Sequence, residues 1–276
     1  MEYSPQTPKI SVLMGAFNCA ATVTAAVNAI IAQTYPFWEL IICDDGSTDD
    51  TYAILQSLAR QEPRIILIQN ASNLGLAPTL NNCLKIARGE YTARMDGDDV
   101  CAPDRFEKEL SVLENNPQFS LVSCAMNFFD DHGVYGVYRY PQYPDKKDFF
   151  KQSPFCHAGC MMRREVLLRL GGYNESDDVL RIEDYDLWFR LYKAGYLGCN
   201  LPDVLYSMYD DRQAFKRRKF KFRVNAAKIK LKVYREFKPG IKYFPSIILP
   251  VIKGFIPEKV YLYLHKKRLH SQISNN

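Results

Sequence analysis

The chain has 276 residues, of which 47 % are hydrophobic and 24 % are charged, values that are ordinary for a globular protein. This length can bury a full core, in one large domain or in one domain with an appendage. The net charge of +5 hides an asymmetry: residues 212–270 carry 18 lysines and arginines against two acidic residues, whereas residues 1–211 carry 18 basic and 29 acidic residues. The sequence therefore predicts an acidic domain over 1–211 and a strongly basic tail over 212–276.

The N-terminus and the cysteines indicate a cytoplasmic protein. The first ten residues, MEYSPQTPKI, are polar, and the next apolar run has only five residues, so neither resembles a signal peptide. The eight cysteines include no CxxC pair, and most lie in apolar segments, which favours buried free thiols in a reducing compartment. A zinc site at Cys156, His157 and Cys160 would lack a second pair of ligands.

Apolar runs of strand length alternate with segments of helical periodicity between residues 10 and 114. The expected strands are ISVLM (10–14), WELIIC (38–43), RIILIQ (64–69) and EYTARM (90–95). The expected helices are TVTAAVNAIIAQ (22–33) with Thr22 as its N-cap, DDTYAILQSLAR (49–60), APTLNNCLKIAR (77–88) and PDRFEKELSVLE (103–114). Four βα units in succession predict a parallel, doubly wound α/β sheet.

Further elements are expected downstream of this sheet. SLVSCAMNFF (120–129) is typical of a strand, and residues 157–176 of a strand and a helix that ends at Gly171-Gly172. RIEDYDLWFRLYKAG (181–195) has the apolar spacing of a helix. No GxGxxG motif follows the first strand, which disfavours a dinucleotide-binding Rossmann domain.

Two of the predicted strands end in clusters of carboxylates, CDDGSTDD (43–50) and MDGDD (95–99). In doubly wound sheets ligands bind beyond the carboxyl ends of the strands, so both clusters are expected to face one crevice. A divalent cation that is already bound to phosphates would relieve the repulsion between such carboxylates. A solvated acidic turn is the structural alternative.

A phosphatase of the haloacid dehalogenase type is the chemical alternative. Its DxDx(T/V) motif is matched by residues 96–100, DGDDV. That motif supplies an aspartate nucleophile and usually follows the first strand, whereas here it follows the fourth, and no later strand ends in a paired-aspartate metal motif.

Five collinear motifs within residues 10–208 resemble the family 2 inverting nucleotide-sugar glycosyltransferases, which have the GT-A fold. They are ISVLMGAFN, ELIICDDGSTDDT, NLGLAPTLNNCLKIARGEYTARMDGDD, HAGCMMRREVLLRLGGYNES and EDYDLWFRLYKAG. Within the family the closest resemblance is to bacterial exopolysaccharide enzymes. The resemblance implies a GT-A catalytic domain over 1–211, with a nucleotide-sugar half at about 9–100 and an acceptor half at about 101–211. The usual proline after the first strand is replaced by Gly15, and Cys83 stands where glycine is common.

The resemblance also implies which residues bind the donor. Ala16 and Asn18 would lie in the turn that contacts the nucleotide sugar. Asp45, with Asp44 beside it, would accept hydrogen bonds from the base.

The remaining roles concern the diphosphate and the acceptor. Asp96 and Asp98 would lie against the ribose and the diphosphate, with Asp98 or Asp99 ligating Mn²⁺ or Mg²⁺. Asp184 would be the catalytic base, supported by Glu183. The chemistry requires both sets, because the leaving diphosphate needs its charge neutralised and the acceptor hydroxyl must lose a proton as it attacks.

The C-terminal tail is basic and interrupted by prolines. Residues 212–238 interleave twelve lysines and arginines with apolar residues, and 241–257 are apolar but contain three prolines and two lysines, which makes a poor transmembrane span. An amphipathic helical stretch on an anionic membrane surface, using 212–270, fits better. Nucleic-acid binding is disfavoured because no recognised nucleic-acid fold accompanies the tail. A protein-docking surface remains an alternative.

These features predict a metal-dependent inverting glycosyltransferase of the cytoplasm, peripheral on the inner face of the cell membrane. We expect it to transfer sugar from a nucleotide-sugar donor, a UDP-sugar, to a lipid-linked or polysaccharide acceptor in exopolysaccharide (biofilm), capsule or cell-envelope glycan synthesis. The alternative is a non-enzymatic or dual-role interaction module on the same fold, which would dock a protein partner through the basic tail.

Overall fold

The computed structural model describes residues 7–209, 220–256 and 260. Its strands are β1 (Ile10–Ala16), β2 (Trp38–Asp44), β3 (Ile65–Gln69), β4 (Tyr91–Asp96), β5 (Val100–Cys101), β6 (Phe119–Asp130), β7 (Gly133–Tyr138), β8 (Cys160–Arg163) and β9 (Leu197–Tyr209). Its helices are α1 (Val23–Ile31), α2 (Thr51–Gln61), α3 (Leu76–Ile86), α4 (Arg105–Asn115), α5 (Arg164–Arg169), α6 (Glu183–Lys193), α7 (Phe220–Phe237) and α8 (Pro245–Lys253). The predicted tail residues 212–219, 257–259 and 261–276 lie outside the described residues.

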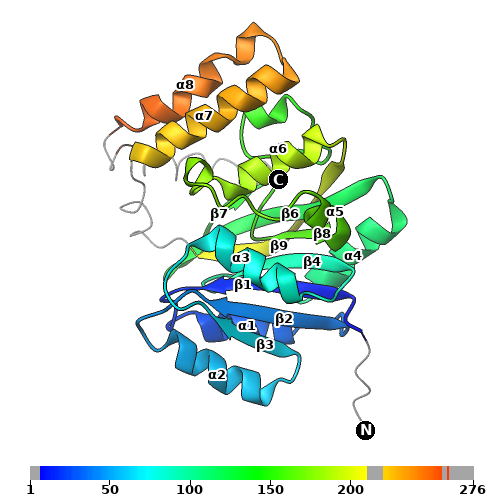
Figure 1. The fold of residues 1–276 in the computed structure, drawn as a ribbon. Coiled ribbons are helices and arrows are strands. Elements are labelled where there is room, and N and C mark those ends of the chain that lie inside the picture. Colours follow the sequence, from blue (N-terminus) through cyan, green and yellow to red (C-terminus); the bar gives the residue numbers. More distant parts are fainter. Residues whose placement is uncertain (1–6, 210–219, 257–259, 261–276) are drawn as a thin grey trace.

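The strands form one sheet in the order β3-β2-β1-β4-β8-β6-β9-β5, with β7 paired to β6 (Figure 1). The first four strands are parallel, as the βα units predicted. The second half of the sheet is mixed: β8 runs antiparallel to both β4 and β6, whereas β9 runs parallel to β6. The doubly wound α/β fold is therefore confirmed. Its antiparallel pairs involve β7 and β8, which follow the fourth βα unit, and the short β5, which lies between β4 and α4 and pairs with β9.

Helices cover both faces of the parallel half because its strands are apolar on both sides. Along β1, Val12 and Met14 pack with α1, α2 and α4, whereas Leu13 packs with α3, α5 and α6. Alternation along a strand thus divides the interior into two hydrophobic clusters. The same division holds for β2, where Leu40 and Ile42 face the first cluster and Ile41 the second.

The predicted N-cap of the first helix has another role. Thr22 occupies the N-cap position, but its hydroxyl donates to the carbonyl oxygens of Cys19 and Gly97 rather than capping the helix. Because Gly97 lies in the MDGDD segment, Thr22 ties the start of α1 to the acidic turn at the end of β4.

Helices α7 and α8 form the outermost layer, beyond α6 (Figure 1). From α7, Ile229 and Val233 are buried in the cluster that also contains α3, α5 and α6. The Phe237 ring meets Phe149 edge to face at 5.6 Å between centroids and lies tilted against Phe189 at 5.4 Å. Helix α7 therefore belongs to the same core as the acidic domain, although its sequence is basic. Among the described residues, no helix combines the length and apolar character needed to cross a membrane.

Candidate active site

The carboxyl end of β1 lies between two acidic strand ends. In the sheet register Ala16 of β1 is opposite Asp44 of β2, and Gly15 is opposite Asp96 of β4 (Figure 1). Neighbouring strands are about 4.8 Å apart, so the backbones at Asp44 and Asp96 are separated by about 10 Å. The two acidic tips predicted to share one crevice thus lie at the same edge of the sheet.

Asp44 and Asp45 organise the loops around the end of β2. Asp44 is fully buried, accepts hydrogen bonds from Gln69 Nε2 and the Ser47 N–H, and keeps its other oxygen without a partner. Asp45 accepts from the N–H groups of Leu74 and Gly75. Its carboxylate thereby fixes the segment that leads into α3.

Ala16 and Asn18 line the turn after β1. The Ala16 carbonyl accepts from the Asp45 N–H at 2.8 Å. Asn18 has a left-handed backbone with φ of 49°, and its side-chain oxygen accepts from the Thr48 N–H at 2.9 Å. An asparagine tolerates this conformation better than most residues. These contacts join the turns after β1 and β2 into one wall of the crevice.

The three aspartates of the MDGDD turn have different environments. Asp96, whose side chain is 30 % exposed, is paired with the buried Arg94 at 2.5 Å. Asp98 is exposed. Asp99 is only 3 % exposed, and each of its oxygens accepts one hydrogen bond at 2.7 Å, from the Tyr206 hydroxyl and from the Tyr209 N–H. Burial, together with the charges of Asp96 and Asp98, raises the pKa of Asp99 to about 8.

The MDGDD turn is supported by Tyr206, a buried residue of β9 that the sequence analysis did not identify. Besides donating to Asp99, its hydroxyl accepts from the Asp96 N–H at 3.2 Å. Arg105 lies 5.5 Å from the Tyr206 ring centroid and pairs with Glu109 at 3.2 Å, both side chains being fully buried. Arg105 also donates to the Arg94 carbonyl. The acidic turn is therefore built on a buried polar network.

Helix α6 presents the second predicted carboxylate set at its N-terminus. The Glu183 carboxylate accepts a hydrogen bond from the backbone N–H of Arg181, and Arg181 has a left-handed backbone with φ of 70°. Burial raises the pKa of Asp184 to about 6; the N–H of Tyr185 lowers it in part, and the Glu183 charge adds to the rise. A carboxylate that titrates near neutral pH suits a general base.

His157 contacts Tyr173 and the α6 residue Trp188. His157 Nε2 is 3.1 Å from the Tyr173 hydroxyl, and the His157 ring meets that of Trp188 at 5.9 Å, one helical turn after Asp184. Burial and the Arg94 charge hold the pKa of His157 well below its usual value, so the ring is neutral. Burial raises the pKa of Tyr173, and the charges of both Asp96 and Asp184 add to the rise.

An α/β sheet whose acidic strand ends share one edge is the arrangement expected of nucleotide-sugar glycosyltransferases with the GT-A fold. Residues 11–171 match the model of Glycosyl transferase family 2. The chain belongs to this family.

The most similar relatives include glycosyltransferases of extracellular and cell-envelope polysaccharides. The chain is 41 % identical over 266 residues to glycosyltransferase EpsE of Bacillus subtilis, a match that covers 96 % of each chain. It is 29 % identical over 248 residues to the amylovoran biosynthesis glycosyltransferase AmsE of Erwinia amylovora, covering 87 % of this chain and 91 % of AmsE.

Solved structures confirm the fold. Residues 1–349 of TarS from S. aureus, in complex with UDP-GlcNAc, superpose with a TM-score of 0.66 at 17 % identity, covering 97 % of this chain and 72 % of that one. The mannosyltransferase PcManGT of Pyrobaculum calidifontis, in complex with GDP-Man and Mn²⁺, gives a TM-score of 0.63 at 21 % identity, with 97 % and 73 % covered.

Proposed function

We propose that the protein is a metal-dependent inverting glycosyltransferase that uses a UDP-sugar and extends a lipid-linked or polysaccharide acceptor. The observation that carries the proposal is the arrangement of the carboxylates. Asp44 and Asp96 flank the end of β1, Asp98 is exposed just beyond it, and Asp184 has a raised pKa. The donor seen with TarS, UDP-GlcNAc, supports a UDP-sugar.

The donor side would be assembled from three turns. The base would lie against Ala16, Asn18, Asp44 and Asp45. The Asp45 N–H bonds to Ala16, and Asn18 and Asp44 both bond to the loop after β2, so this wall is in place before the donor arrives. Asp45 would accept from the base while it holds the loop before α3. Preorganised acceptors of this kind lower the entropic cost of binding.

The acidic turn fits a cation that arrives with the diphosphate. Within the described residues, no three His, Cys, Asp or Glu side chains converge to bind a metal on their own. Asp99 is committed to Tyr206 and Tyr209, which leaves exposed Asp98 as the direct ligand and Asp96 as its neighbour. One or two carboxylates plus substrate phosphates are the usual ligands of Mg²⁺. Bound there, Mn²⁺ or Mg²⁺ would neutralise charge that develops on the leaving diphosphate.

Asp184 would take the proton of the acceptor hydroxyl as that oxygen attacks the anomeric carbon. A single displacement breaks the bond to the diphosphate as the new glycosidic bond forms, which inverts the anomeric centre. Glu183 keeps the backbone before α6 in its left-handed conformation and would support the base in this way.

A lipid-linked acceptor is supported by a relative and by the composition of the tail. The Escherichia coli enzyme WfaP is 32 % identical over 204 residues, covering 72 % of this chain and 77 % of WfaP, and its name describes a UDP-Glc:alpha-D-GlcNAc-diphosphoundecaprenol beta-1,3-glucosyltransferase. The basic residues of 212–270 would hold the protein on the anionic inner face of the cell membrane, where such acceptors lie.

A panel of nucleotide sugars, assayed by hydrolysis and by thermal shift with and without Mn²⁺, tests this function. We expect one UDP-sugar to stabilise the protein only when Mn²⁺ is present. Asp98→Ala should abolish this metal-dependent shift, whereas Asp184→Asn should keep the shift and lose transfer. A donor shift that is independent of both Mn²⁺ and Asp98 would show that the metal assignment is wrong.

A further inference from the structure

Exposed apolar side chains are concentrated in α7, in α8 and in the short segments beside them. Of the sixteen large apolar residues that are exposed in the described part of the chain, seven lie between 220 and 255: Phe220, Ile241, Phe244, Ile248, Leu249, Ile252 and Phe255. Ile241 and Phe255 are 79 % and 76 % exposed, which is more than any of the others. Such a concentration of exposed apolar side chains points to an interaction site.

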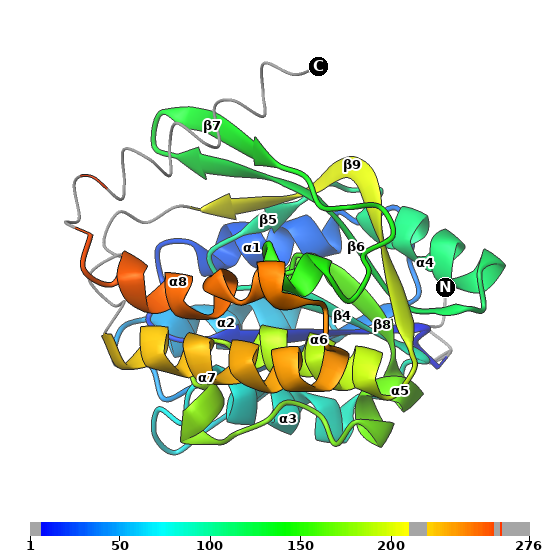
Figure 2. The same ribbon diagram turned by 90° about the horizontal axis from the view of Figure 1, so that it is seen from above.

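The exposed residues of α8 share one face of the helix. Ile248 and Ile252 are spaced by four positions, which places them on one side of the helix, and Leu249 lies beside them. Phe255 follows the end of α8, and its ring meets that of Phe220 edge to face at 5.4 Å between centroids. Ile247, by contrast, is buried, and α8 packs against α7. Figures 1 and 2 show α7 and α8 side by side on the outside of the molecule, beyond α6. No described element covers the outer face of α8.

The segment that carries these apolar side chains is strongly basic. Residues 220–256 contain nine lysines and arginines and a single acidic residue, Glu236. At the seam between the helices, burial and the charge of Lys253 lower the pKa of Lys230 to about 8. Neither lysine has an ion-pair partner among the described residues. Two cations held together in this way would be stabilised by an anion between them.

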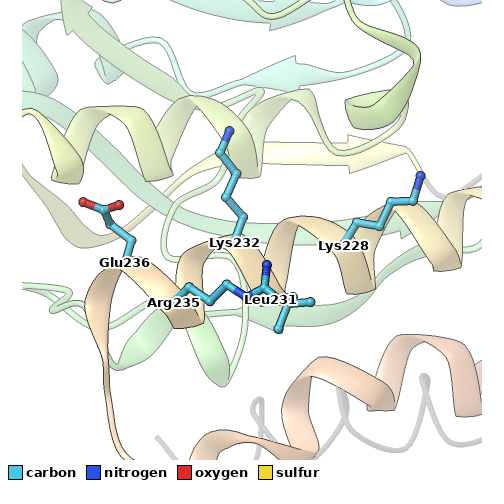
Figure 3. Close-up of a pocket in the computed structure, with 5 residues that line it drawn as sticks. All are labelled: Lys228, Leu231, Lys232, Arg235 and Glu236. Atoms are coloured by element: carbon cyan, nitrogen blue, oxygen red, sulfur yellow. The ribbon is translucent and has the colours of Figure 1, made fainter.

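The other lysines of α7 are already used within the protein. A hollow of about 340 Å³ on α7 is lined by Lys228, Leu231, Lys232, Arg235 and Glu236 (Figure 3). There Lys228 pairs with Asp178 at 3.0 Å, and Lys232 lies 5.4 Å from the Phe189 ring and 4.0 Å from Asp186. Glu236 pairs with Lys193 of α6. These ion pairs attach α7 to the catalytic domain. Lys230 and Lys253 make no such pairs within the described part of the chain.

We propose that α8 and the turn after it enter the lipid bilayer, with Ile248, Ile252 and Phe255 among the acyl chains and Lys230 and Lys253 on a phospholipid phosphate. The apolar side chains are complementary to the acyl chains of a bilayer, and the lysines are complementary to its anionic head groups. The inference deepens the membrane part of the proposed function and rests on it. Because α7 packs against α6, the bilayer contact is connected through two helices to Asp184.

Vesicle binding of the full chain tests the inference. The vesicles contain equal parts of phosphatidylglycerol and phosphatidylcholine, with pure phosphatidylcholine for comparison. We expect the Ile252→Glu/Phe255→Glu variant to bind the anionic vesicles about tenfold or more weakly than wild type. Lys230→Gln/Lys253→Gln should reduce the preference for anionic over neutral vesicles. Leu168→Glu, at an exposed apolar position on α5, is the matched control and should bind as wild type does.

A tryptophan at α8 gives an independent readout. Both native tryptophans are buried, so Ile252→Trp adds a reporter whose emission should shift to shorter wavelength on vesicles and be quenched by brominated lipid. The inference would be refuted if the wild type binds vesicles, the tryptophan emission does not shift, and the α8 variants bind as strongly as wild type. Membrane attachment through another part of the chain would then stand. Absence of wild-type binding would refute both, and transfer to a soluble acceptor would still report on the catalytic proposal.

Discussion

At the scale of single residues, Asp184 determines how the enzyme should respond to pH. Burial raises its pKa to about 6, and a general base acts only in its deprotonated form. The value of kcat/KM should therefore rise with pH below about 6, roughly tenfold per pH unit, and level off above it. A pH profile with saturating metal measures this limb.

Asp184→Asn is the companion variant, because it keeps the shape of the side chain and removes the base. We expect a loss of about 10²–10⁴-fold in kcat. If the rise of kcat/KM is centred near pH 4, or if it persists in the Asp184→Asn variant, the base is another residue.

Tyr206 makes a second prediction at this scale. Its hydroxyl bonds to both the Asp96 N–H and the Asp99 carboxylate inside the protein. Tyr206→Phe leaves a buried carboxylate with one donor fewer, which should lower the free energy of unfolding by about 1–3 kcal/mol. It should also raise the KM for the nucleotide sugar, because the acidic turn loses its support.

Tyr192→Phe provides the control for Tyr206. The Tyr192 hydroxyl is also buried and donates to the Pro144 carbonyl, away from the acidic turn. This variant should lose stability without a change in the donor KM. An equal change of KM in both variants would mean that the effect of Tyr206→Phe is a general loss of stability.

At the scale of elements, the Arg105–Glu109 pair anchors α4 beneath the site. Both side chains are fully buried, and Arg105 also donates to the carbonyl oxygens of Arg94 and Cys160. Arg105→Met would leave Glu109 as an uncompensated buried charge, at a cost of about 3–5 kcal/mol in the free energy of unfolding. Arg105→Met/Glu109→Leu should recover most of this loss. Urea denaturation measures both variants.

Lys108→Met on the same helix is the control for this pair. Lys108 pairs with Asp104 and Asp203 on the surface, so its loss should cost less than about 1 kcal/mol. Equal losses for the Lys108 and Arg105 variants would contradict the role assigned to the buried pair.

The elements that the sequence predicted are those with local periodicity. The four βα units and α6 were all predictable, because each apolar pattern lies within one segment. Strand β9 was not, since Pro202 and Asp203 interrupt its pattern; in the structure they fall in a bulge, where the register against β6 jumps from Leu201 to Val204. Tyr206 lies beyond that bulge, and so the strand that supports the acidic turn could not be found from local sequence.

The same limit applies to the site. The acidic clusters were visible because several carboxylates are adjacent in the sequence. The different environments of the three aspartates in MDGDD could not be predicted, since the burial and hydrogen bonding of Asp99 depend on Tyr206 and Tyr209, more than a hundred residues away. The resemblance to the family supplied Asp184, for which spacing alone allowed an ordinary acidic first turn of a helix.

At the scale of the whole molecule, the relation of the basic segment to the catalytic domain is the remaining question. Composition predicted a boundary near residue 211, yet Ile229 and Val233 of α7 are buried with residues of α3, α5 and α6. Charge composition reports the solvent-facing side of a helix, whereas its buried side decides which core it joins. Helix α7 should therefore unfold together with the catalytic domain.

Ile229→Ala tests this cooperativity. Ile229 is 5 % exposed, and its truncation should lower the free energy of unfolding of the whole chain by about 2–5 kcal/mol. Tryptophan fluorescence follows the catalytic core, because Trp38 and Trp188 both lie in it, and circular dichroism follows all helices. We expect both probes to shift to the same lower denaturant midpoint. Leu231→Ala, a partly exposed position on the same helix, should shift it much less. If the fluorescence midpoint stays at the wild-type value while the helical signal is lost earlier, α7 is a separate unit and the boundary lies before it.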